Sequence, residues 1–394
     1  MTALSGTTAR SWEVPHLEDL LPLEGKRVLL RVDYNVPLAD GPAGSRVVVD
    51  DYRIRMTMPT INWLLEHGAH VTACSHLGRP KGKVDERYSM EPVRARLAEL
   101  APGVELLDNL RFDPGEEAND DKTVERLVAG HDCYVNDAFG AAHRAHASVV
   151  GPPRFLPSAA GRLLAREVEV LGSLLDAPKR PFVAVVGGAK VADKLGVLES
   201  LIARVDTLIV GGGMSYTFLA AMGHRIGASL FDESKLEACK ALLDSGVQIL
   251  LPADIVAISP DGKINFGGNP AVESLGSTAV VERDIEDGWE GVDIGPRTRR
   301  AYAEAISGAA TLLWNGPMGA FEDSRFGEGT KAVAEAVAAC EGFSVVGGGD
   351  SVAALDKYGL SEGIDHISTG GGASLEYLEK GDLPGLAALR AAVR

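Results

Sequence analysis

Residues 181–194, PFVAVVGGAKVADK, contain a short apolar run that ends at two glycines and leads into a stretch typical of a helix. A continuous apolar run is typical of a strand that is buried on both faces. The order of apolar run and glycine cluster recurs at IVGGGM (209–214), VVGGGD (345–350) and STGGGA (368–373). These stretches predict a parallel sheet that is covered by helices on both sides.

The rest of the chain also alternates between apolar runs and stretches with helical periodicity. The expected strands are residues 28–33, 71–75, 104–107, 133–137, 181–188, 207–213, 249–257, 311–316, 343–350 and 366–372. The expected helices include residues 53–68, 121–130, 235–246 and 329–340. This alternation predicts the α/β class, and the number of strands favours two sheets over one.

A domain boundary is expected in the helical run GRLLAREVEVLGSLL (161–175), which Pro178 and Pro181 separate from the next strand. The chain has 394 residues, and at roughly 150 residues per domain this length supports two or three domains. The final stretch, GDLPGLAALRAAVR (381–394), is too short to fold alone and is expected to dock on another part of the chain.

The composition excludes several classes of protein. The net charge of −16 disfavours binding to nucleic acid or to an anionic membrane. No apolar run approaches the roughly 20 residues of a membrane helix, and the N-terminus lacks the pattern of a secretory signal. The cysteines at 74, 133, 239 and 340 lie far apart, which predicts a reduced, cytosolic protein without disulfides or structural zinc.

Glycine accounts for 46 residues, and its clusters stand where predicted strands end. Glycines at the ends of parallel strands let main-chain N–H groups approach phosphate oxygens, although any one cluster can also serve only a sharp turn. The chain has no GxxxxGK[ST] motif, and Tyr216 occupies the third glycine position of the GxGxxG spacing that begins at Gly211. Asp232 lies where a dinucleotide site has its ribose-binding acid, which leaves a nicotinamide-dependent dehydrogenase open.

Two lysines favour a polyphosphate ligand in the second half of the chain. Lys190 and Lys194 are four residues apart at the start of a predicted helix, which would place both on one face about 6 Å apart. Cations there oppose the helix dipole unless a polyphosphate binds them, although two solvated lysines remain the alternative. Asp350 closes VVGGGD and is suited either to ligate Mg²⁺ or to cap the following helix.

Polar and basic residues follow the predicted strands of the first half. Arg31, Asp33 and Asn35 are spaced two apart and are expected to share one face of a strand end, where Arg31 and Asp33 either pair internally or bind a ligand. The arginines near successive strand ends are Arg53, Arg79, Arg111 and Arg144. They favour a basic pocket for a small, doubly anionic molecule over four independent surface side chains. The neighbouring histidines lack the spacing of metal ligands.

The order of these motifs resembles the phosphoglycerate kinase family. The matching stretches, found between residues 26 and 380, are RVDYNVP, SHLGRP, NLRF, NDAFGAAHRAH, GGAKVADK, IVGGGM, WNGPMGAFE, VVGGGD and STGGGAS. The resemblance implies two Rossmann-like lobes, each a doubly wound, mostly parallel sheet, joined by a hinge helix. It also implies phosphoryl transfer between ATP and 3-phosphoglycerate.

The resemblance assigns a role to each matching residue. It implies that 3-phosphoglycerate is bound by Asp33, Asn35, Arg53, His76, Leu77, Gly78, Arg79, Arg111 and Arg144. It implies that the nucleotide is bound by Lys194, Gly211, Gly212, Gly213, Gly291, Glu322, Gly348, Gly349, Asp350 and Ser351, with residues 370–372 also lining the cleft. The implied catalytic residues are Arg53, Lys190, Gly348 and Gly371, and the implied Mg²⁺ ligand is Asp350. Ser351 stands where many relatives have threonine, and the loop 39–51 matches no motif of the family.

These assignments predict a 3-phosphoglycerate-binding lobe over residues 1–172, a nucleotide-binding lobe over 173–378 and a tail, 379–394, docked on the first lobe. Transfer between substrates held by different lobes predicts hinge closure, with the bend near residues 161–181. We expect a cytoplasmic monomer whose partners are its small-molecule substrates. A dehydrogenase and a non-catalytic, anion-binding scaffold of the same fold remain the alternatives.

Overall fold

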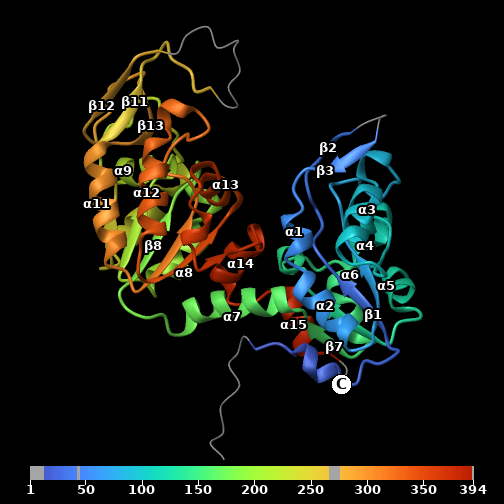
Figure 1. Cartoon of the computed structure of the whole chain (residues 1–394). Helices are drawn as coiled ribbons and strands as arrows, with labels where there is room; N and C mark the ends of the chain where they lie inside the picture. The colour runs from blue at the N-terminus through green and yellow to red at the C-terminus, as the bar shows by residue number, and fades with distance from the viewer. Residues whose placement is uncertain (1–12, 42–44, 266–275, 393–394) are drawn as a thin grey trace, which may run out of the picture. The chain divides into compact units, whose positions relative to one another are not determined.

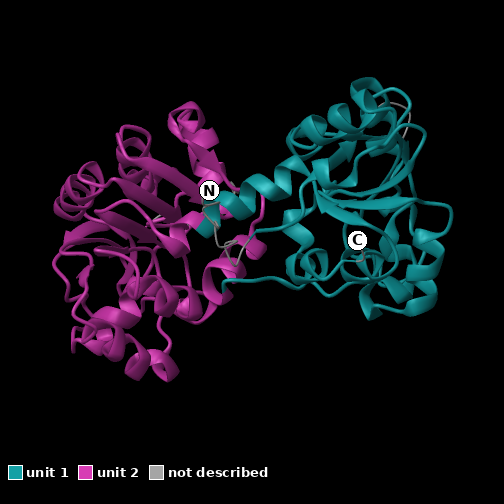
Figure 2. Ribbon diagram, turned by 90° about the horizontal axis from the view of Figure 1, so that it is seen from below, with its two compact units in different colours: residues 1–172, 381–394 teal, residues 173–380 magenta. Residues whose placement is uncertain are grey.

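The computed structural model describes residues 13–41, 45–265 and 276–392. Its contacts divide the chain into two compact units, which are residues 1–172 together with 381–394, and residues 173–380 (Figure 2). The boundary falls inside α7 (Arg162–Asp176), so the helix predicted over 161–175 is confirmed. The first turn of α7 is capped from the first unit, because Thr60 Oγ1 accepts from Arg162 N and Asp137 Oδ1 accepts from Leu164 N.

The first unit is built on a parallel sheet with the strand order β5-β4-β1-β6-β7. Its strands are β1 (Arg27–Arg31), β4 (His70–Cys74), β5 (Glu105–Leu106), β6 (Cys133–Asn136) and β7 (Ser158–Ala160). Its helices are α1 (Tyr52–Arg55), α2 (Met58–Glu66), α3 (Glu91–Leu100), α4 (Pro114–Ala118), α5 (Asp121–Val128), α6 (Ala147–Val150) and α15 (Pro384–Arg390) (Figure 1). The strand order reverses between β1 and β6, and ligands bind at such a point in doubly wound sheets.

Two parts of the first unit differ from the sequence-based expectation or extend it. Strand β7 was not expected, because its three small residues, Ser-Ala-Ala, form no apolar run. Two short strands, β2 (Leu38–Asp40) and β3 (Arg46–Val48), overlap the loop 39–51 and pair in antiparallel fashion. Leu38 and Val48 of these strands pack against the core of the unit.

The second unit is built on a larger parallel sheet with the order β10-β9-β8-β14-β15-β16. Its strands are β8 (Phe182–Val186), β9 (Thr207–Val210), β10 (Gln248–Leu250), β14 (Thr311–Asn315), β15 (Phe343–Gly347) and β16 (His366–Ile367). Its helices are α8 (Leu195–Ile202), α9 (Met214–Ala221), α10 (Leu236–Leu243), α11 (Pro296–Ser307), α12 (Glu328–Ala338), α13 (Gly349–Tyr358) and α14 (Gly372–Lys380). Here the order reverses between β8 and β14. The two parallel sheets confirm the α/β prediction.

The strand predicted over residues 249–257 is wrong as a single element. The chain leaves the parallel sheet after β10 and enters an antiparallel sheet with the order β12-β11-β13. Its strands are β11 (Ile255–Ile258), β12 (Thr278–Val281) and β13 (Glu290–Ile294). The physical cause lies between the two segments, where Pro252 lacks an N–H donor and Asp254 caps α11 by accepting from Thr298 N at 2.8 Å.

The C-terminal helix α15 packs against α6 and β7 of the first unit. Its Leu386 and Leu389 are fully buried, and Gly385 N donates to Ala142 O at 2.8 Å. A Cβ at Gly385 would lie 2.9 Å from Val149 Cγ1, so the close approach of this helix requires glycine. The short final stretch is thus stabilised by burial rather than by its own length.

Candidate active site

The ends of three strands meet in the first unit. Val32 N donates to Cys74 O, and Asp137 N donates to Arg31 O at 2.8 Å, so the residues that follow β1, β4 and β6 are neighbours. These strands lie on both sides of the reversal in strand order. The sheet therefore brings together the segments in which the sequence predicted ligand-binding side chains.

Asp33 forms its ion pair with Arg53 and not with Arg31. The Arg53 Nη1 to Asp33 Oδ2 distance is 2.7 Å, whereas Arg31 is fully buried and donates to Ser148 Oγ, Val32 O and His76 Nδ1. Of the two alternatives for these residues, the internal Arg31–Asp33 pair does not form, because β1 ends at Arg31 and the residues after it do not continue the strand. Burial opposes the charge of Asp33, but positive neighbours that include the bonded Arg53 lower the pKa of its carboxyl group.

A glycine turn joins the loops that follow β1, β4 and β5. Gly78 has a φ of +60°, its N donates to Asn35 Oδ1 at 2.8 Å and its O accepts from Arg111 Nη1 at 2.7 Å. Leu77 is buried, and its N donates to Asn109 Oδ1 at 3.2 Å. Sequence reasoning missed Asn109, which bonds both the N and the O of Leu77 and was visible only as the first letter of NLRF.

The site carries positive charge that the protein does not neutralise. Arg79 is exposed and Arg144 is half-buried, and within the described part of the chain neither guanidinium has a hydrogen-bond or ion-pair partner. Arg111 is nearly buried, with its Nε 3.2 Å from Glu117 Oε1. Burial, followed by the charge of Arg144, lowers the pKa of Arg111.

Two histidines in this group are held neutral. Burial is the main cause that lowers the pKa of His146, to about 4, and Arg111 and Arg144 add to it. Burial likewise keeps the pKa of His76 well below its usual value, and Arg31, Arg111 and Arg144 act in the same direction against the opposing charge of Asp33. Such crowding of positive groups favours an anionic ligand.

In the second unit, Lys194 lies at the reversal between β8 and β14. Its Nζ donates to Asn315 O at 3.1 Å and to Asn315 Oδ1 at 2.5 Å. Burial lowers the pKa of Lys194 to about 8 against the opposing charges of Asp350 and Asp193. Asn315 follows TLLW in β14, and its place in the motif WNGPMGAFE does not predict its contact with the lysine.

The helical spacing argument for Lys190 and Lys194 is wrong. A short 3-10 helix, Val191–Asp193, separates them, and α8 begins only at Leu195. Lys190 is exposed and has no hydrogen-bond or ion-pair partner among the described residues. The two lysines are therefore near one another in sequence but do not share an α-helical face.

The glycine clusters of this unit divide into two kinds. Gly212 has a φ of +69°, and a Cβ there would lie 2.7 Å from Gly188 O and 2.8 Å from Pro317 O. Gly212 is therefore explained by a tight turn, because neighbouring main-chain atoms occupy the space that a side chain would need. By contrast, a Cβ at Gly349, Gly371 or Gly372 would meet nothing within 4 Å. The main chain at these three positions is open to a ligand.

Of the two roles that the sequence allows for Asp350, capping α13 is not observed. Gly348, with a φ of +90°, is the N-cap residue, so Asp350 lies within the first turn and does not cap the helix. The carboxylate of Asp350 is exposed, and among the described residues it has no hydrogen-bond or ion-pair partner. Ser351 is buried, and its Oγ accepts from Gly316 N at 2.6 Å.

The other residues considered for nucleotide binding lie in three different kinds of structure: a buried strand, an exposed loop and a short 3-10 helix. Gly291 is buried inside β13, its N donates to Ser229 Oγ at 2.8 Å, and a Cβ there would lie 2.4 Å from the Tyr216 hydroxyl oxygen. Glu322 is exposed on the loop after β14. Asp232 accepts from Ser234 N and Ser234 Oγ and so caps a short 3-10 helix.

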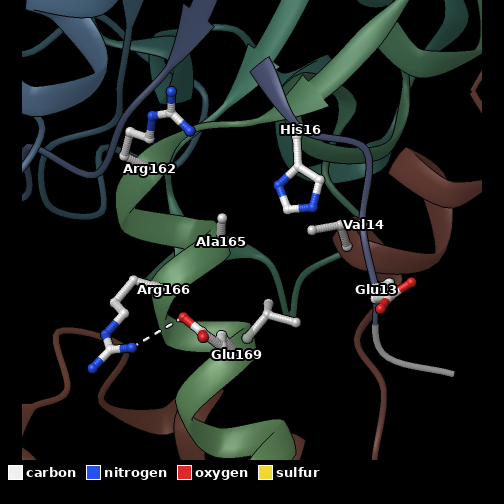
Figure 3. A pocket seen from close by; sticks show the side chains of 8 residues that line it. Glu13, Val14, His16, Arg162, Ala165, Arg166 and Glu169 are labelled. Atoms are coloured by element: carbon white, nitrogen blue, oxygen red, sulfur yellow. Dashed lines mark hydrogen bonds and ion pairs between the residues drawn. The ribbon is translucent and has the colours of Figure 1, made fainter. Parts of the chain in front are cut away.

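A pocket of about 410 Å³ lies in the first unit beside α7 (Figure 3). It is lined by Glu13, Val14, His16, Arg162, Ala165, Arg166, Val168 and Glu169. Figure 3 shows Arg166 paired with Glu169 on the helix, opposite the segment that carries His16. None of the predicted site residues lines this pocket.

Neither a cluster of metal-ligating side chains nor a membrane-spanning helix occurs among the described residues. Within residues 13–41, 45–265 and 276–392, no three His, Cys, Asp or Glu side chains are grouped so that they could hold a metal ion. Over the same residues, every helix is too short or too polar to span a membrane.

Comparison with known proteins gives a consistent result. The family model for phosphoglycerate kinase matches residues 17–105 and 101–381. Relatives named phosphoglycerate kinase include one from Roseiflexus castenholzii, 49% identical over 93% of this chain and 96% of its own, and one from Moorella thermoacetica, 50% identical over 94% and 97%. The solved structure of phosphoglycerate kinase from Coxiella burnetii is 38% identical, with a TM-score of 0.85, and the match covers 96% of this chain and 99% of that one.

These matches extend over nearly the whole chain and confirm the resemblance seen in its motifs. The dehydrogenase and scaffold alternatives gain no support from them. The chain belongs to the phosphoglycerate kinase family.

Proposed function

We propose that this chain catalyses reversible phosphoryl transfer between ATP and the carboxylate of 3-phosphoglycerate. A carboxylate oxygen forms a bond to the γ-phosphorus while the bond between that phosphorus and the β–γ bridging oxygen breaks, giving 1,3-bisphosphoglycerate and ADP. The observation that carries the proposal is the surplus of positive charge in the first unit, where Arg79 and Arg144 have no partner among the described residues. A small molecule with a phosphate and a carboxylate matches that charge.

The first unit is the proposed acid-binding lobe. The residues assigned to 3-phosphoglycerate are Asp33, Asn35, Arg53, His76, Leu77, Gly78, Arg79, Arg111 and Arg144. The bonds of Gly78 to Asn35 and Arg111 support a shared role for the loops after β1, β4 and β5. Arginine is suited to this task because its planar fork binds a phosphate or a carboxylate through two parallel hydrogen bonds.

The second unit is the proposed nucleotide-binding lobe. The residues assigned to ATP are Lys194, Gly211, Gly212, Gly213, Gly291, Glu322, Gly348, Gly349, Asp350 and Ser351, with Lys190, Gly348 and Gly371 close to the transferred phosphoryl group. Open main chain at Gly349 and Gly371 supports the approach of N–H groups to phosphate oxygens. Lys190 has no hydrogen-bond or ion-pair partner among the described residues, which supports a role in binding the phosphate groups of the ligand.

The chain also fits a role for Mg²⁺ bound with the nucleotide. Asp350 offers an exposed carboxylate in the first turn of α13, and Mg²⁺ in kinases is commonly held by one or two carboxylates together with phosphate oxygens and water. When bound, the ion would neutralise part of the phosphate charge. Lys194, whose Nζ donates to Asn315 Oδ1 at 2.5 Å, would keep its ammonium group oriented at the end of the neighbouring strand β14.

The chemistry needs no general base. The nucleophile is the carboxylate of the substrate, which is ionised at neutral pH because carboxyl pKa values lie near about 4. Phosphoryl transfer depends mainly on positioning and on neutralising charge. Arg53, already held by Asp33, and Lys190 are the side chains assigned to the reacting groups.

We further propose that the two lobes close during turnover, with the bend near residues 161–181. The reason is chemical, since the two substrates are assigned to different units and direct transfer requires them to meet. Small-angle scattering should give a smaller radius of gyration with both substrates than with neither. An unchanged radius would argue strongly against closure.

The catalytic proposal is tested by a coupled assay with ATP and 3-phosphoglycerate. Added glyceraldehyde-phosphate dehydrogenase converts the product and oxidises NADH, so the absorbance of NADH should fall only when both substrates are present. Mixtures lacking the acid or the nucleotide serve as controls. Folded protein that shows no acid-dependent oxidation of NADH would overturn the proposal.

We also propose a cytoplasmic location and a monomeric state. Cys74, Cys133, Cys239 and Cys340 are all free thiols, which fits a reducing compartment. Each unit has a hydrophobic core of its own. Light scattering coupled to size-exclusion chromatography should give a mass near the 41.4 kDa of one chain.

A further inference from the structure

A chain of buried polar groups lies beneath the proposed acid-binding residues of the first unit. Arg31 Nε donates to Ser148 Oγ at 2.8 Å, and Ser148 Oγ donates to Glu116 Oε1 at 2.6 Å. Ser148 N donates to the second oxygen, Glu116 Oε2, at 2.9 Å. All three side chains have at most 1% of their surface exposed, so this chain forms a charged network inside the core.

Burying an arginine and a glutamate is unfavourable unless both are paired. Here Ser148 stands between them and relays the hydrogen bonds, so that Glu116 balances Arg31 without touching it. Apolar side chains would fill the same space without this desolvation penalty. The network therefore points to a requirement for a charged group at Arg31.

The far end of the network meets His76. Arg31 Nη2 lies 3.2 Å from His76 Nδ1. A guanidinium has only donors, so the lone pair of Nδ1 must accept this bond. In a neutral imidazole the remaining proton is then on Nε2, which is left as a donor for another group.

The surroundings of His76 support the neutral form. Burial is the largest cause that lowers its pKa, and Arg31, Arg111 and Arg144 lower it further, whereas the charge of Asp33 acts in the opposite direction. His76 lies in the segment after β4, among residues assigned to the acid. A neutral ring with a fixed N–H group gives a directed donor to an anion.

We propose that Glu116, Ser148 and Arg31 are positioning residues that hold His76 as the Nε2–H tautomer, so that this N–H donates a hydrogen bond to the phosphorylated acid. The inference rests on the proposed function for the identity of the acid. The tautomer itself is a property of the free protein and does not depend on turnover.

The first test measures the tautomer directly. Nitrogen-15 NMR of histidine side chains in the free protein should show His76 with an unprotonated Nδ1 and a protonated Nε2 at neutral pH. The signal is assigned by its loss in His76→Gln. A protonated Nδ1, or a doubly protonated ring, would overturn the proposal whatever the activity of the protein.

The second test breaks the network at its centre. Ser148→Ala leaves Arg31 Nε and Glu116 without their shared partner, so we expect the Nε2–H population of His76 to fall. The KM for the acid should rise about three- to tenfold, as for one weakened hydrogen bond, while the KM for ATP changes little. Ser158→Ala is the matched control, because it removes a hydroxyl whose one hydrogen bond within the described part of the chain goes to Leu156 O, and it should change neither property.

Glu116→Gln provides a second variant if Ser148→Ala folds poorly. It keeps the size of the side chain and removes the charge that balances Arg31, so the tautomer and the acid KM should move in the same direction. A folded variant with an unaltered His76 spectrum and an unaltered acid KM would reduce the network to a structural role. Wild-type protein that lacks acid-dependent turnover but shows the expected tautomer would instead contradict the proposed function alone.

Discussion

The two units place their candidate sites at equivalent points of their sheets but build them from different material. In the first unit the groups are side chains that the protein already holds, such as Arg53 on Asp33 and Arg111 on Gly78 O. In the second unit much of the candidate surface is main chain, open at Gly349 and Gly371. The first unit has fixed some of its polar groups before a ligand arrives, while Arg79 and Arg144 stay without a partner among the described residues. The second unit leaves space beside its backbone.

This difference predicts how each kind of site recognises its ligand and how it responds to substitution. Side chains with fixed hydrogen bonds select a ligand by the direction of its groups, and the loss of one such group should affect one interaction. A glycine-rich strand end recognises phosphate through N–H groups, which any added Cβ can displace. Substitutions should therefore act on chemistry in the first unit and on backbone geometry in the second.

The largest effect is expected for Arg53→Ala in the first unit. This change removes a preorganised cation and leaves the Asp33 carboxylate without its 2.7 Å partner, so kcat should fall about 10²–10³-fold. The affinity for ATP should change little, because the nucleotide is assigned to the other unit. Steady-state kinetics of the coupled assay measure the first quantity and calorimetric titration with ATP measures the second.

Arg55→Ala is the matched control for Arg53→Ala. Arg55 lies on the same short helix and is exposed, and among the described residues its side chain pairs with Asp51 alone. Its loss should therefore leave kcat near that of the wild type. A large loss of ATP affinity in Arg53→Ala at unchanged kcat would contradict the assigned role. It would also show that the two units do not bind their substrates separately.

An intermediate effect is expected for Gly212→Ala in the second unit. The positive φ of +69° and the approach of Gly188 O to 2.7 Å from the new Cβ should lower the free energy of unfolding by about 1–3 kcal/mol. Nucleotide affinity should fall with the altered turn, while acid affinity stays the same. Gly308→Ala is the control, since a Cβ there has its nearest neighbour at 3.9 Å and φ is −88°.

Urea unfolding of both variants gives the comparison. Equal stability of Gly212→Ala and Gly308→Ala would show that the main chain at Gly212 can relax. In that case the division of the glycines into packed and open positions would lose its physical basis.

The sequence predicted the fold and the candidate site unequally well. The apolar runs at β1, β8 and β14 were found because buried parallel strands have continuous apolar residues. The same signal does not predict strand β7, which has three small residues, or the break between β10 and β11. Both features depend on tertiary contacts and on capping. Periodicity is a local signal and does not report such contacts.

Partners within the site were harder to predict than its members. The arginines and glycines were identified by residue type and by their place after strands. The sequence does not predict that Arg31 bonds Ser148 instead of pairing with Asp33, because Arg31 and Ser148 are 117 positions apart in the chain. The same holds for Lys194 and Asn315, which are 121 residues apart.

The smallest expected effect concerns His146, where the charge crowding of the first unit becomes a dependence of stability on pH. Burial and the neighbouring Arg111 and Arg144 lower the pKa of His146 to about 4, and they outweigh the opposing charge of Glu116, whose Oε1 lies 3.8 Å from His146 Nδ1. The unfolded chain, with a histidine pKa near about 6.5, then binds a proton that the native state does not. The native state therefore keeps its full stability above about pH 6.5 and loses part of it as the pH falls toward 4.

His146→Gln should remove this loss, by about 1 kcal/mol between about pH 7 and about pH 5.5 after allowance for partial exposure of the ring. His70→Gln, at the exposed start of β4, is the control and should leave the acid side of the stability curve as in the wild type. Urea unfolding at several pH values measures both.

A bound dianion should oppose the effect by favouring the protonated ring, so 3-phosphoglycerate should stabilise the wild type more at low pH than it stabilises His146→Gln. An acid curve that is identical in His146→Gln and the wild type would show that the positive charge around His146 is already neutralised, which would weaken the argument for an anion site in the first unit.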